Sequence, residues 1–355
     1  MKFNKGEWSE LYAIFYLLCN RKLHIVDSNL KAISNNIFLV ESIFSSKKNG
    51  IIRFDINNEF VIPTIFGEMI NPIKIRDIEF LKNVLFKSII TLGGNGKGSF
   101  EIKSIEKWLC KNSINISNFK GSSQLKEDIN LLNFDVRTNK IYNLGYSIKS
   151  QLGSPATILN ASNHTNFRYK VKGLNTEQIN EINSINTRTK LKDRIEKIYS
   201  YRGKIFFDKV ISETFETNLK MIDMLLPEAL AECLIKSYEE GEKDLKKLFE
   251  KSSVYSNLNI SIKKLEDFLT AVSFGMFPSE QWNGRYSANG GLIIVTMNSE
   301  VYVLDMIYFY NEVKKYLINE TKLDSPSSSR YDMLRLEEQE GEIYFTLNLQ
   351  VRYKK

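Results

Sequence analysis

Residues 126–162 read KEDINLLNFDVRTNKIYNLGYSIKSQLGSPATILNAS, and this stretch predicts two β-strands joined by a turn. Apolar and polar residues alternate through DINLLNFDV, and aromatic and β-branched residues fill IYNLGYSIKS, which is typical of strands. The polar residues 137–140 supply the turn. A turn centred between Thr138 and Asn139 would place the carboxylate of Asp128 directly opposite the ammonium of Lys149.

The second strand carries polar residues on one face, because Ser147, Lys149 and Gln151 are spaced two apart. Carboxylate oxygens bind Mg²⁺, and a neighbouring lysine can orient water or stabilise charge on a phosphate. The pattern resembles the PD-(D/E)XK nucleases, with Asp128 in the Asp position and residues 147–149 in the (D/E)XK position. Ser147 stands where those nucleases have a second carboxylate. The alternative interpretation is a cross-strand ion pair that only stabilises the sheet.

The composition describes an ordinary globular chain. Of 355 residues, 43% are hydrophobic and 26% charged, which is enough for one large domain or two smaller ones. The net charge of +7 favours a polyanionic partner. The odd, scattered cysteines (Cys19, Cys110 and Cys233) argue against a disulfide framework and favour a reducing cytoplasm. We expect no secretory signal and no membrane span, because no apolar run is long enough for either.

Histidine is nearly absent, which excludes several kinds of site. His24 and His164 are the only two, and neither lies in a zinc-binding or HNH pattern. Zinc catalysis and Ser-His-Asp chemistry are therefore disfavoured. A phosphodiesterase built from this sequence must use carboxylates and lysine.

The N-terminal region predicts a helix from residue 6 to residue 19. Trp8, Leu11, Phe15 and Leu18 recur at spacings of three and four, and Glu10 lies beside this apolar stripe. Glu10 could face a neighbouring active site or be a solvated carboxylate. Residues 23–90 predict several strands and then a helix, and 101–109 a further helix.

Residues 92–99, LGGNGKGS, resemble a phosphate-binding loop but lack the GxxxxGK[ST] spacing. We therefore expect a basic linker there that could touch a DNA phosphate, and not a nucleotide-binding ATPase.

The second half of the chain predicts polar loops and helices. Asn160, Asn163 and Asn166 could bond base edges or phosphates, or belong to a polar cap. The basic residues of 182–201 follow a helical pattern, and 206–220 also reads as a helix. Two turn-rich loops, 282–291 and 324–331, carry Arg285 and Arg330.

The chain as a whole resembles the HpaII family of type II restriction endonucleases. The resemblance rests on NKGEWSELY (4–12), SSQLKEDINL (122–131), GYSIKSQLGSPATILNAS (145–162), AVSFGMFPSEQWNGRYSANGG (271–291), KLDSPSSSRY (322–331) and LNLQVRY (347–353). It implies an α+β (mixed α/β) fold, with a PD-(D/E)XK core sheet flanked by helices and added target-recognition elements. We assign residues 1–200 to the nuclease core and 201–355 to target recognition.

The resemblance also implies an activity: Mg²⁺-dependent cleavage of unmethylated double-stranded DNA, expected at 5′-CCGG-3′, beside a cognate cytosine methyltransferase. It makes Asp128 a metal ligand, Lys149 the catalytic lysine and Glu10 the second metal-binding carboxylate. No Asp or Glu lies between Lys149 and Glu177 to take that place. Ser147 and Gln151 complete the candidate site, and Gln151 could bind the metal or its water. Asp135, near the turn, ranks below Asp128.

A GC-rich target also suggests which residues read the bases. Guanine offers two acceptors to an arginine, so Arg285 and Arg330 are candidates for that contact, with Ser327 and Ser328 beside phosphates or bases. Either arginine could instead be a plain phosphate contact. The protein could act as a monomer or a transient homodimer. The competing hypothesis is a non-catalytic DNA-binding protein in which Asp128 and Lys149 only stabilise the sheet.

Overall fold

The computed structural model describes residues 2–34, 37–47, 50–93, 98–115, 125–327 and 330–354. Its contacts divide the chain into two compact units. Unit 1 comprises residues up to 156 together with 286–316, and unit 2 comprises 157–285 and 317–354. The first change of unit comes after residue 156. The functional division into nuclease core and recognition region stays a prediction. No helix among the described residues is both long and apolar enough to cross a membrane.

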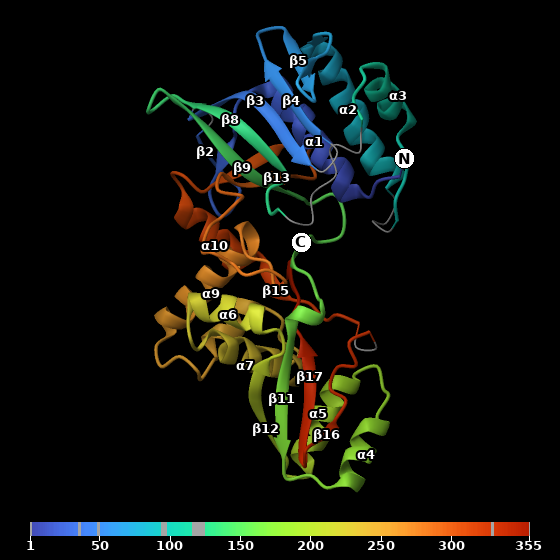
Figure 1. Cartoon of the computed structure of the whole chain (residues 1–355), viewed down its shortest axis with the longest axis vertical. Coiled ribbons are helices and arrows are strands. Elements are labelled where there is room, and N and C mark those ends of the chain that lie inside the picture. The colour runs from blue at the N-terminus through green and yellow to red at the C-terminus, as the bar shows by residue number, and fades with distance from the viewer. Residues whose placement is uncertain are drawn as a thin grey trace. The chain divides into compact units, whose positions relative to one another are not determined.

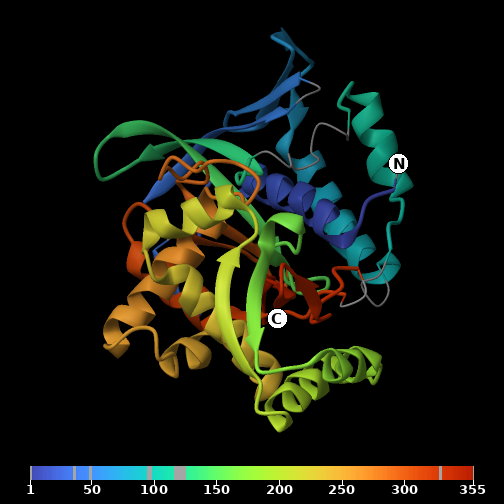
Figure 2. The ribbon, with the colours of Figure 1, turned by 60° about the horizontal axis from the view of Figure 1, so that its bottom comes forward.

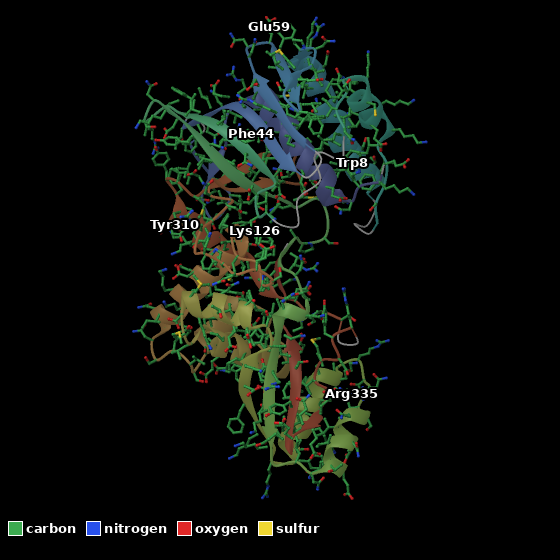
Figure 3. The ribbon with its side chains drawn as sticks, in the orientation of Figure 1. Trp8, Phe44, Glu59, Lys126, Tyr310 and Arg335 are labelled. Carbon is green, nitrogen blue, oxygen red and sulfur yellow. The ribbon has the colours of Figure 1, made fainter. Side chains whose placement is uncertain are left out.

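Unit 1 is built on helix α1 (Lys5–Asn20). Asn4 and Glu7 form a capping box at its start, and Arg21 ends it in the left-handed conformation with φ of 59°. Trp8, labelled in Figure 3, is fully buried with most of the helix. α1 packs against helix α2 (Ile75–Leu92) and against the central strands of a sheet. Figures 1 and 2 show the two helices side by side, with α3 (Lys103–Lys111) beyond them. The predicted N-terminal helix is confirmed.

A large mixed sheet forms the rest of unit 1. Among the described residues it has eleven strands. Its order is β2 (Ala32–Ser34), β1 (Ile25–Val26), β14 (Val301–Asp305), β13 (Gly291–Val295), β9 (Lys140–Ser150), β8 (Ile129–Asp135), β3 (Phe38–Lys47), β4 (Gly50–Ile56), β5 (Phe60–Ile65) and β6 (Glu68–Met69), with β7 (Ile73–Lys74) on β5. β9 pairs parallel with β13 and antiparallel with β8. The expected α+β architecture, a mixed sheet flanked by helices, is confirmed.

The hairpin β8–β9 forms as predicted, but its register differs by two residues. Asp135 pairs with Lys140 and Ile129 with Tyr146, which centres the turn between Arg137 and Thr138. The same register, continued, places Asp128 opposite Ser147, so the prediction of Lys149 opposite Asp128 is wrong. Because a shift of two keeps every side chain on its face of a sheet, Asp128, Ser147 and Lys149 still share one face.

Unit 2 contains two smaller sheets. One has the order β12 (Lys204–Val210), β11 (Asn166–Lys172), β17 (Glu342–Asn348) and β16 (Glu337–Gln339), and the other β10 (Thr157–Leu159), β18 (Val351–Tyr353) and β15 (Thr321–Leu323). Its helices are α4 (Thr176–Ser184), α5 (Lys190–Ser200), α6 (Glu213–Ile222), α7 (Leu226–Glu239), α8 (Leu245–Glu250) and α9 (Leu258–Phe274), and α10 (Tyr310–Glu320) crosses the boundary between the units. The basic stretch 182–201 is therefore two helices, and 206–220 begins as a strand.

Candidate active site in unit 1

Asp128 is fixed at the open end of the hairpin by backbone and side-chain bonds. Its N–H donates to Tyr146 O at 2.8 Å, just before β8 begins. Its Oδ2 accepts the N–H of Ile148 at 2.6 Å and the hydroxyl of Ser147 at 3.2 Å. The start of the polar segment of β9 thus orients the carboxylate through a backbone N–H and a hydroxyl.

Lys149 joins the same cluster through Ser147. Its Nζ donates to Ser147 Oγ at 2.8 Å, and its backbone pairs with Ile294 of β13. Ser147 is buried, with 1% of its surface exposed. The hydroxyl therefore accepts from the lysine and donates to the carboxylate, so it holds the two charged groups in one chain of hydrogen bonds.

Glu10 and Lys149 line one pocket, whereas Asp128 and Ser147 are not among the residues that line it. The pocket, about 330 Å³ in volume, is lined by Glu10, Lys149, Lys5, Ser150, Ser154 and neighbouring residues of α1 and the segment after β9. The Oε2 atom of Glu10 is buried. The helix that carries Glu10, α1, is bonded to β9, because the hydroxyl of Ser150 donates to Ser9 Oγ at 2.8 Å. The fold thus brings Glu10 of the first helix to the lysine of the hairpin.

Gln151 does not share the pocket. It follows the last residue of β9, its backbone N–H donates to Val295 O at 2.9 Å, and its side chain is not among those lining the cavity. Asp135, the rival aspartate, is buried at the turn and accepts bonds from Tyr308 Oη at 2.5 Å and Arg137 N at 2.8 Å. Burial opposes its ionisation, but these bonds outweigh it and lower the pKa of Asp135. Asp135 is therefore a structural carboxylate.

Two further lysines lie at the site that the sequence interpretation did not include. Lys126, labelled in Figure 3, precedes Asp128 by two residues. Burial, and then the charge of Lys149, lower the pKa of Lys126 to about 8. Lys5 lines the pocket and donates from Nζ to Leu152 O at 3.0 Å. Their positions in the sequence, close to Asp128 and in the first turn of the Glu10 helix, could have indicated both.

The predicted DNA contacts that the structure describes belong to unit 2. Asn160 and Asn163 are exposed, whereas Asn166 accepts a bond from Asn348 Nδ2 at 2.6 Å. The exposed Ser327 accepts the N–H of Arg330 at 3.4 Å. A hydrogen bond joins the segment of Arg330 to the segment of the asparagines: Tyr331 Oη donates to Ala161 O at 2.9 Å. The structure thus brings the Arg330 loop beside the asparagine segment, while Ser328 lies outside the described residues.

Arg285 is exposed at the end of a loop that Asn218 organises. This fully buried amide donates to Phe277 O at 3.1 Å and Glu280 O at 2.8 Å, and accepts the N–H of Trp282 at 2.9 Å. Trp282 in turn donates from Nε1 to Arg285 O at 2.8 Å. Of the Gly-rich stretch 92–99, residues 94–97 lie outside the described residues.

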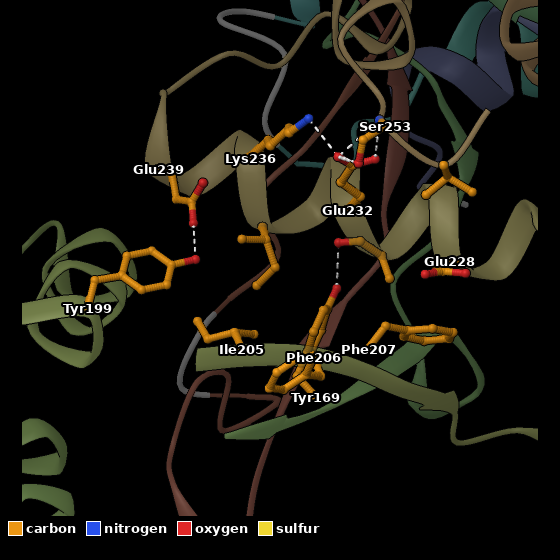
Figure 4. A pocket seen from close by; sticks show the side chains of 13 residues that line it. Tyr169, Tyr199, Ile205, Phe206, Phe207, Glu228, Glu232, Lys236, Glu239 and Ser253 are labelled. Atoms are coloured by element: carbon orange, nitrogen blue, oxygen red, sulfur yellow. Dashed lines mark hydrogen bonds and ion pairs between the residues drawn. The ribbon is translucent and has the colours of Figure 1, made fainter. Parts of the chain in front are cut away.

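A separate pocket of about 350 Å³ lies in unit 2, between β12 and α7 (Figure 4). Aromatic side chains of β11, β12 and α5 line it, together with the acids of α7. Tyr199 donates to Glu239 at 2.5 Å, and Glu232 accepts from Lys236 at 2.7 Å and from Ser253 Oγ at 2.8 Å. Carboxylates outnumber lysines here, so this pocket does not suit a DNA phosphate.

The comparisons with known proteins cover nearly the whole chain. Residues 4–353 match the family model described as HpaII restriction endonuclease. The chain is 36% identical over 360 residues to the type II restriction enzyme HpaII of Haemophilus parainfluenzae, a match that spans 99% of this chain and 98% of that protein. No solved structure gives a significant match. With a family match and a relative that both extend over almost its full length, the chain belongs to the HpaII restriction endonuclease family.

Proposed function

We propose that this restriction endonuclease hydrolyses phosphodiester bonds of double-stranded DNA at the pocket between α1 and β9, with Mg²⁺ as its metal and a PD-(D/E)XK arrangement as its core. The observation that carries the proposal is the hydrogen-bonded chain from Lys149 through Ser147 to Asp128, together with a pocket that Lys149 and Glu10 line. A structural ion pair alone would not need a pocket next to it.

Asp128 and Glu10 are the residues that would hold the metal. Both offer carboxylate oxygens, the ligands that Mg²⁺ prefers. Among the described residues no group of three or more His, Cys, Asp or Glu side chains is arranged to hold a metal ion. In proteins Mg²⁺ keeps several waters and binds through one or two carboxylates and the substrate phosphate. When bound, Mg²⁺ polarises a phosphoryl oxygen and activates water.

Lys149 acts on the phosphate and the attacking water. The bond from its Nζ to Ser147 Oγ fixes the direction of the ammonium, so the side chain needs no reordering when substrate arrives. A fixed cation next to the scissile phosphate stabilises the negative charge that builds up during attack. Ser147 thereby replaces the second carboxylate as the group that positions the lysine, and Glu10 supplies the acid from another element.

Target recognition is assigned to unit 2. We expect 5′-CCGG-3′ as the site, with Arg285 and Arg330 on guanine edges, and with Ser327, Ser328 and the segment from Asn160 to Asn166 on phosphates or bases. Cutting DNA in a cell requires that the host sequence be protected. We therefore expect a cognate cytosine methyltransferase and a cytoplasmic location, with the enzyme active as a monomer or a transient homodimer.

The test is digestion of unmethylated and CCGG-methylated plasmid with and without Mg²⁺, for wild type and Lys149→Ala. We expect discrete fragments from unmethylated DNA only, and none from the variant. Arg335→Ala, a change at an exposed residue of unit 2 (Figure 3), is the control and should cut normally. Salt-sensitive binding without any cutting would instead identify a DNA-binding protein in which Asp128 and Lys149 are structural.

A further inference from the structure

The active-site pocket contains a second lysine with a defined position. Lys5 is in the first turn of α1 and lines the same cavity as Lys149 and Glu10. The bond from Lys5 Nζ to Leu152 O places its ammonium on the segment that follows β9. Among these three charged side chains two are cationic and one is anionic, so the lining of the cavity itself offers two groups that can bind phosphate.

The path of the Lys5 side chain is set by two glycines. A Cβ at Gly93 would lie 2.1 Å from Lys5 Cε, and a Cβ at Gly153 would lie 3.3 Å from Lys5 Cβ. The first distance is far below any normal contact, so the alkyl chain passes where Gly93 has no side chain. A solvated surface lysine needs no such space. The two glycines leave room for the alkyl chain, and the bond from Nζ to Leu152 O fixes the ammonium at its end.

We propose that Lys5 binds a phosphate of the DNA strand next to the one that is cut. This inference rests on the proposed function, because Lys149 serves the scissile phosphate in the same pocket. Successive phosphates of one strand follow each other about every 3.4 Å along the helix axis, so the phosphate next to the scissile one is the nearest further anion for a second lysine in the same pocket. Lys5 thus positions the strand for Lys149, and no proton or bond is transferred at Lys5.

The choice of variants separates this role from a structural one. Lys5→Gln keeps a donor that can bond Leu152 O, but it removes the charge. Lys5→Arg keeps the charge and should restore most of the function. Lys2→Gln removes an exposed lysine of the same N-terminal segment that does not line the pocket, and it serves as the matched control. Thermal unfolding of each variant shows whether the fold is retained.

The first measurement is the affinity for a duplex containing 5′-CCGG-3′ over a range of salt concentrations, without divalent metal so that no cutting occurs. Loss of one phosphate contact reduces the slope of log K against log[salt] by about 0.9. We expect this reduction for Lys5→Gln and not for Lys5→Arg or Lys2→Gln. An unchanged slope for a folded Lys5→Gln protein would overturn the proposal.

The second measurement locates the phosphate. Duplexes that each carry one uncharged methylphosphonate linkage are bound by wild type and by Lys5→Gln. A methylphosphonate at the linkage next to the cut site should weaken DNA binding by wild type. It should have little effect on DNA binding by Lys5→Gln, because the methylphosphonate and the substitution remove the same contact between Lys5 and the phosphate. If the effects are additive at every linkage, Lys5 touches no phosphate. That result would leave the digestion by wild type and Lys149→Ala unaffected, so the failure of this inference is distinct from failure of the proposed function.

Discussion

Ser147 lies opposite Asp128 and donates its hydroxyl to Asp128 Oδ2 at 3.2 Å. In the expected register an ammonium would have occupied this position, in direct contact with the carboxylate. The observed register places a neutral hydroxyl between them, and Lys149 reaches it from the next position on the same face. Lys149 and Asp128 are thus joined through the hydroxyl of Ser147.

Replacing Ser147 tests whether the hydroxyl positions the lysine. Ser147→Ala removes the acceptor of Lys149 Nζ, and a hydrogen bond to a charged group contributes about 1.5–3 kcal/mol. We expect the single-turnover cleavage rate to fall by about tenfold or more, with DNA affinity unchanged. Rapid-quench assays at saturating enzyme measure this. Ser88→Ala, which removes a hydroxyl bonded within α2, should cut at the wild-type rate. Equal rates for both variants would show that Ser147 has no positioning role.

Glu10→Gln tests the second carboxylate. The amide keeps the size of the side chain but is a far weaker metal ligand. Mutation of a group that only hydrogen-bonds to a metal ligand lowers metal affinity about 10–100-fold. Loss of a ligand itself should have at least this effect, so the Mg²⁺ concentration for half-maximal cleavage should rise by at least about tenfold. Titration of cleavage with MgCl₂ measures this.

The control for that experiment is on the same helix. Glu7 belongs to the capping box and accepts the N–H of Asn4 at 2.8 Å, so Glu7→Gln should affect stability and leave the Mg²⁺ requirement unchanged. A normal Mg²⁺ requirement in Glu10→Gln would remove Glu10 from the metal site.

The sequence was sufficient to predict α1 and the existence of the hairpin, because both depend on local pattern. The apolar stripe and the polar residues before Trp8 define the helix. The register was missed because the turn was centred one position late. Asp135 Oδ1 accepts the N–H of Arg137, and Asn139 takes a left-handed φ of 55° while its N–H donates to Asp135 O. Asp at the start of a turn and Asn in the left-handed region are common, so the pattern was present in the sequence.

Strand β12 was missed for a different reason. Its residues KIFFDKV have two adjacent aromatics and no clear alternation, and its partner β11 lies some thirty residues earlier in the chain, as the pairing of Lys172 with Lys204 shows. Strand preference depends mainly on such partners. At the site, the proximity of Glu10 and Lys5 to Lys149 comes from the packing of α1 on β9; the family resemblance indicated Glu10, and the position of Lys5 in the same helix follows from it.

Asp305 predicts a pH dependence of stability. It is fully buried, and its Oδ1 has no hydrogen-bond partner among the described residues. Burial raises the pKa of Asp305 to about 6 despite bonds from backbone N–H groups such as Tyr308. An unfolded Asp has a pKa of about 3.9, so between about pH 4 and about pH 6 the folded protein binds more protons. The contribution of this group to stability is therefore present below about pH 4 and is lost as the pH rises through about 6.

Asp305→Asn should remove the loss of stability that ionisation of Asp305 causes as the pH rises through about 6. Between about pH 4 and about pH 7 the stability of wild type should fall relative to the variant by up to ~3 kcal/mol, from a shift of about two units. Urea unfolding at several pH values measures the difference. Asp135→Asn is the control with the opposite sign, because the pKa of Asp135 is lowered and its contribution is lost on acidification. A pH-independent difference between wild type and Asp305→Asn would mean that Asp305 titrates normally.

Asn218→Leu tests whether the Arg285 loop reads the target. The change leaves Phe277 O, Glu280 O and Trp282 N without their buried partner. Each unsatisfied buried group costs about 1–3 kcal/mol, so the loop should rearrange to reach water and Arg285 should lose its defined position. We expect affinity for the target duplex to fall toward that for unrelated DNA, since base contacts carry the specificity and phosphate contacts the rest. The ratio of the two dissociation constants, measured at one salt concentration, reports this.

A loss of stability alone would not change that ratio. Asn257 caps α9 by accepting the N–H of Asn259 at 2.8 Å, and Asn257→Ala should cost about 1 kcal/mol while leaving the preference for the target intact. Both variants lie in unit 2 and lose an asparagine, so only the position of the loop separates them. If Asn218→Leu binds as selectively as Asn257→Ala, the Arg285 loop does not read the bases. Recognition would then rest on the Arg330 loop and the asparagine segment that Tyr331 joins to it.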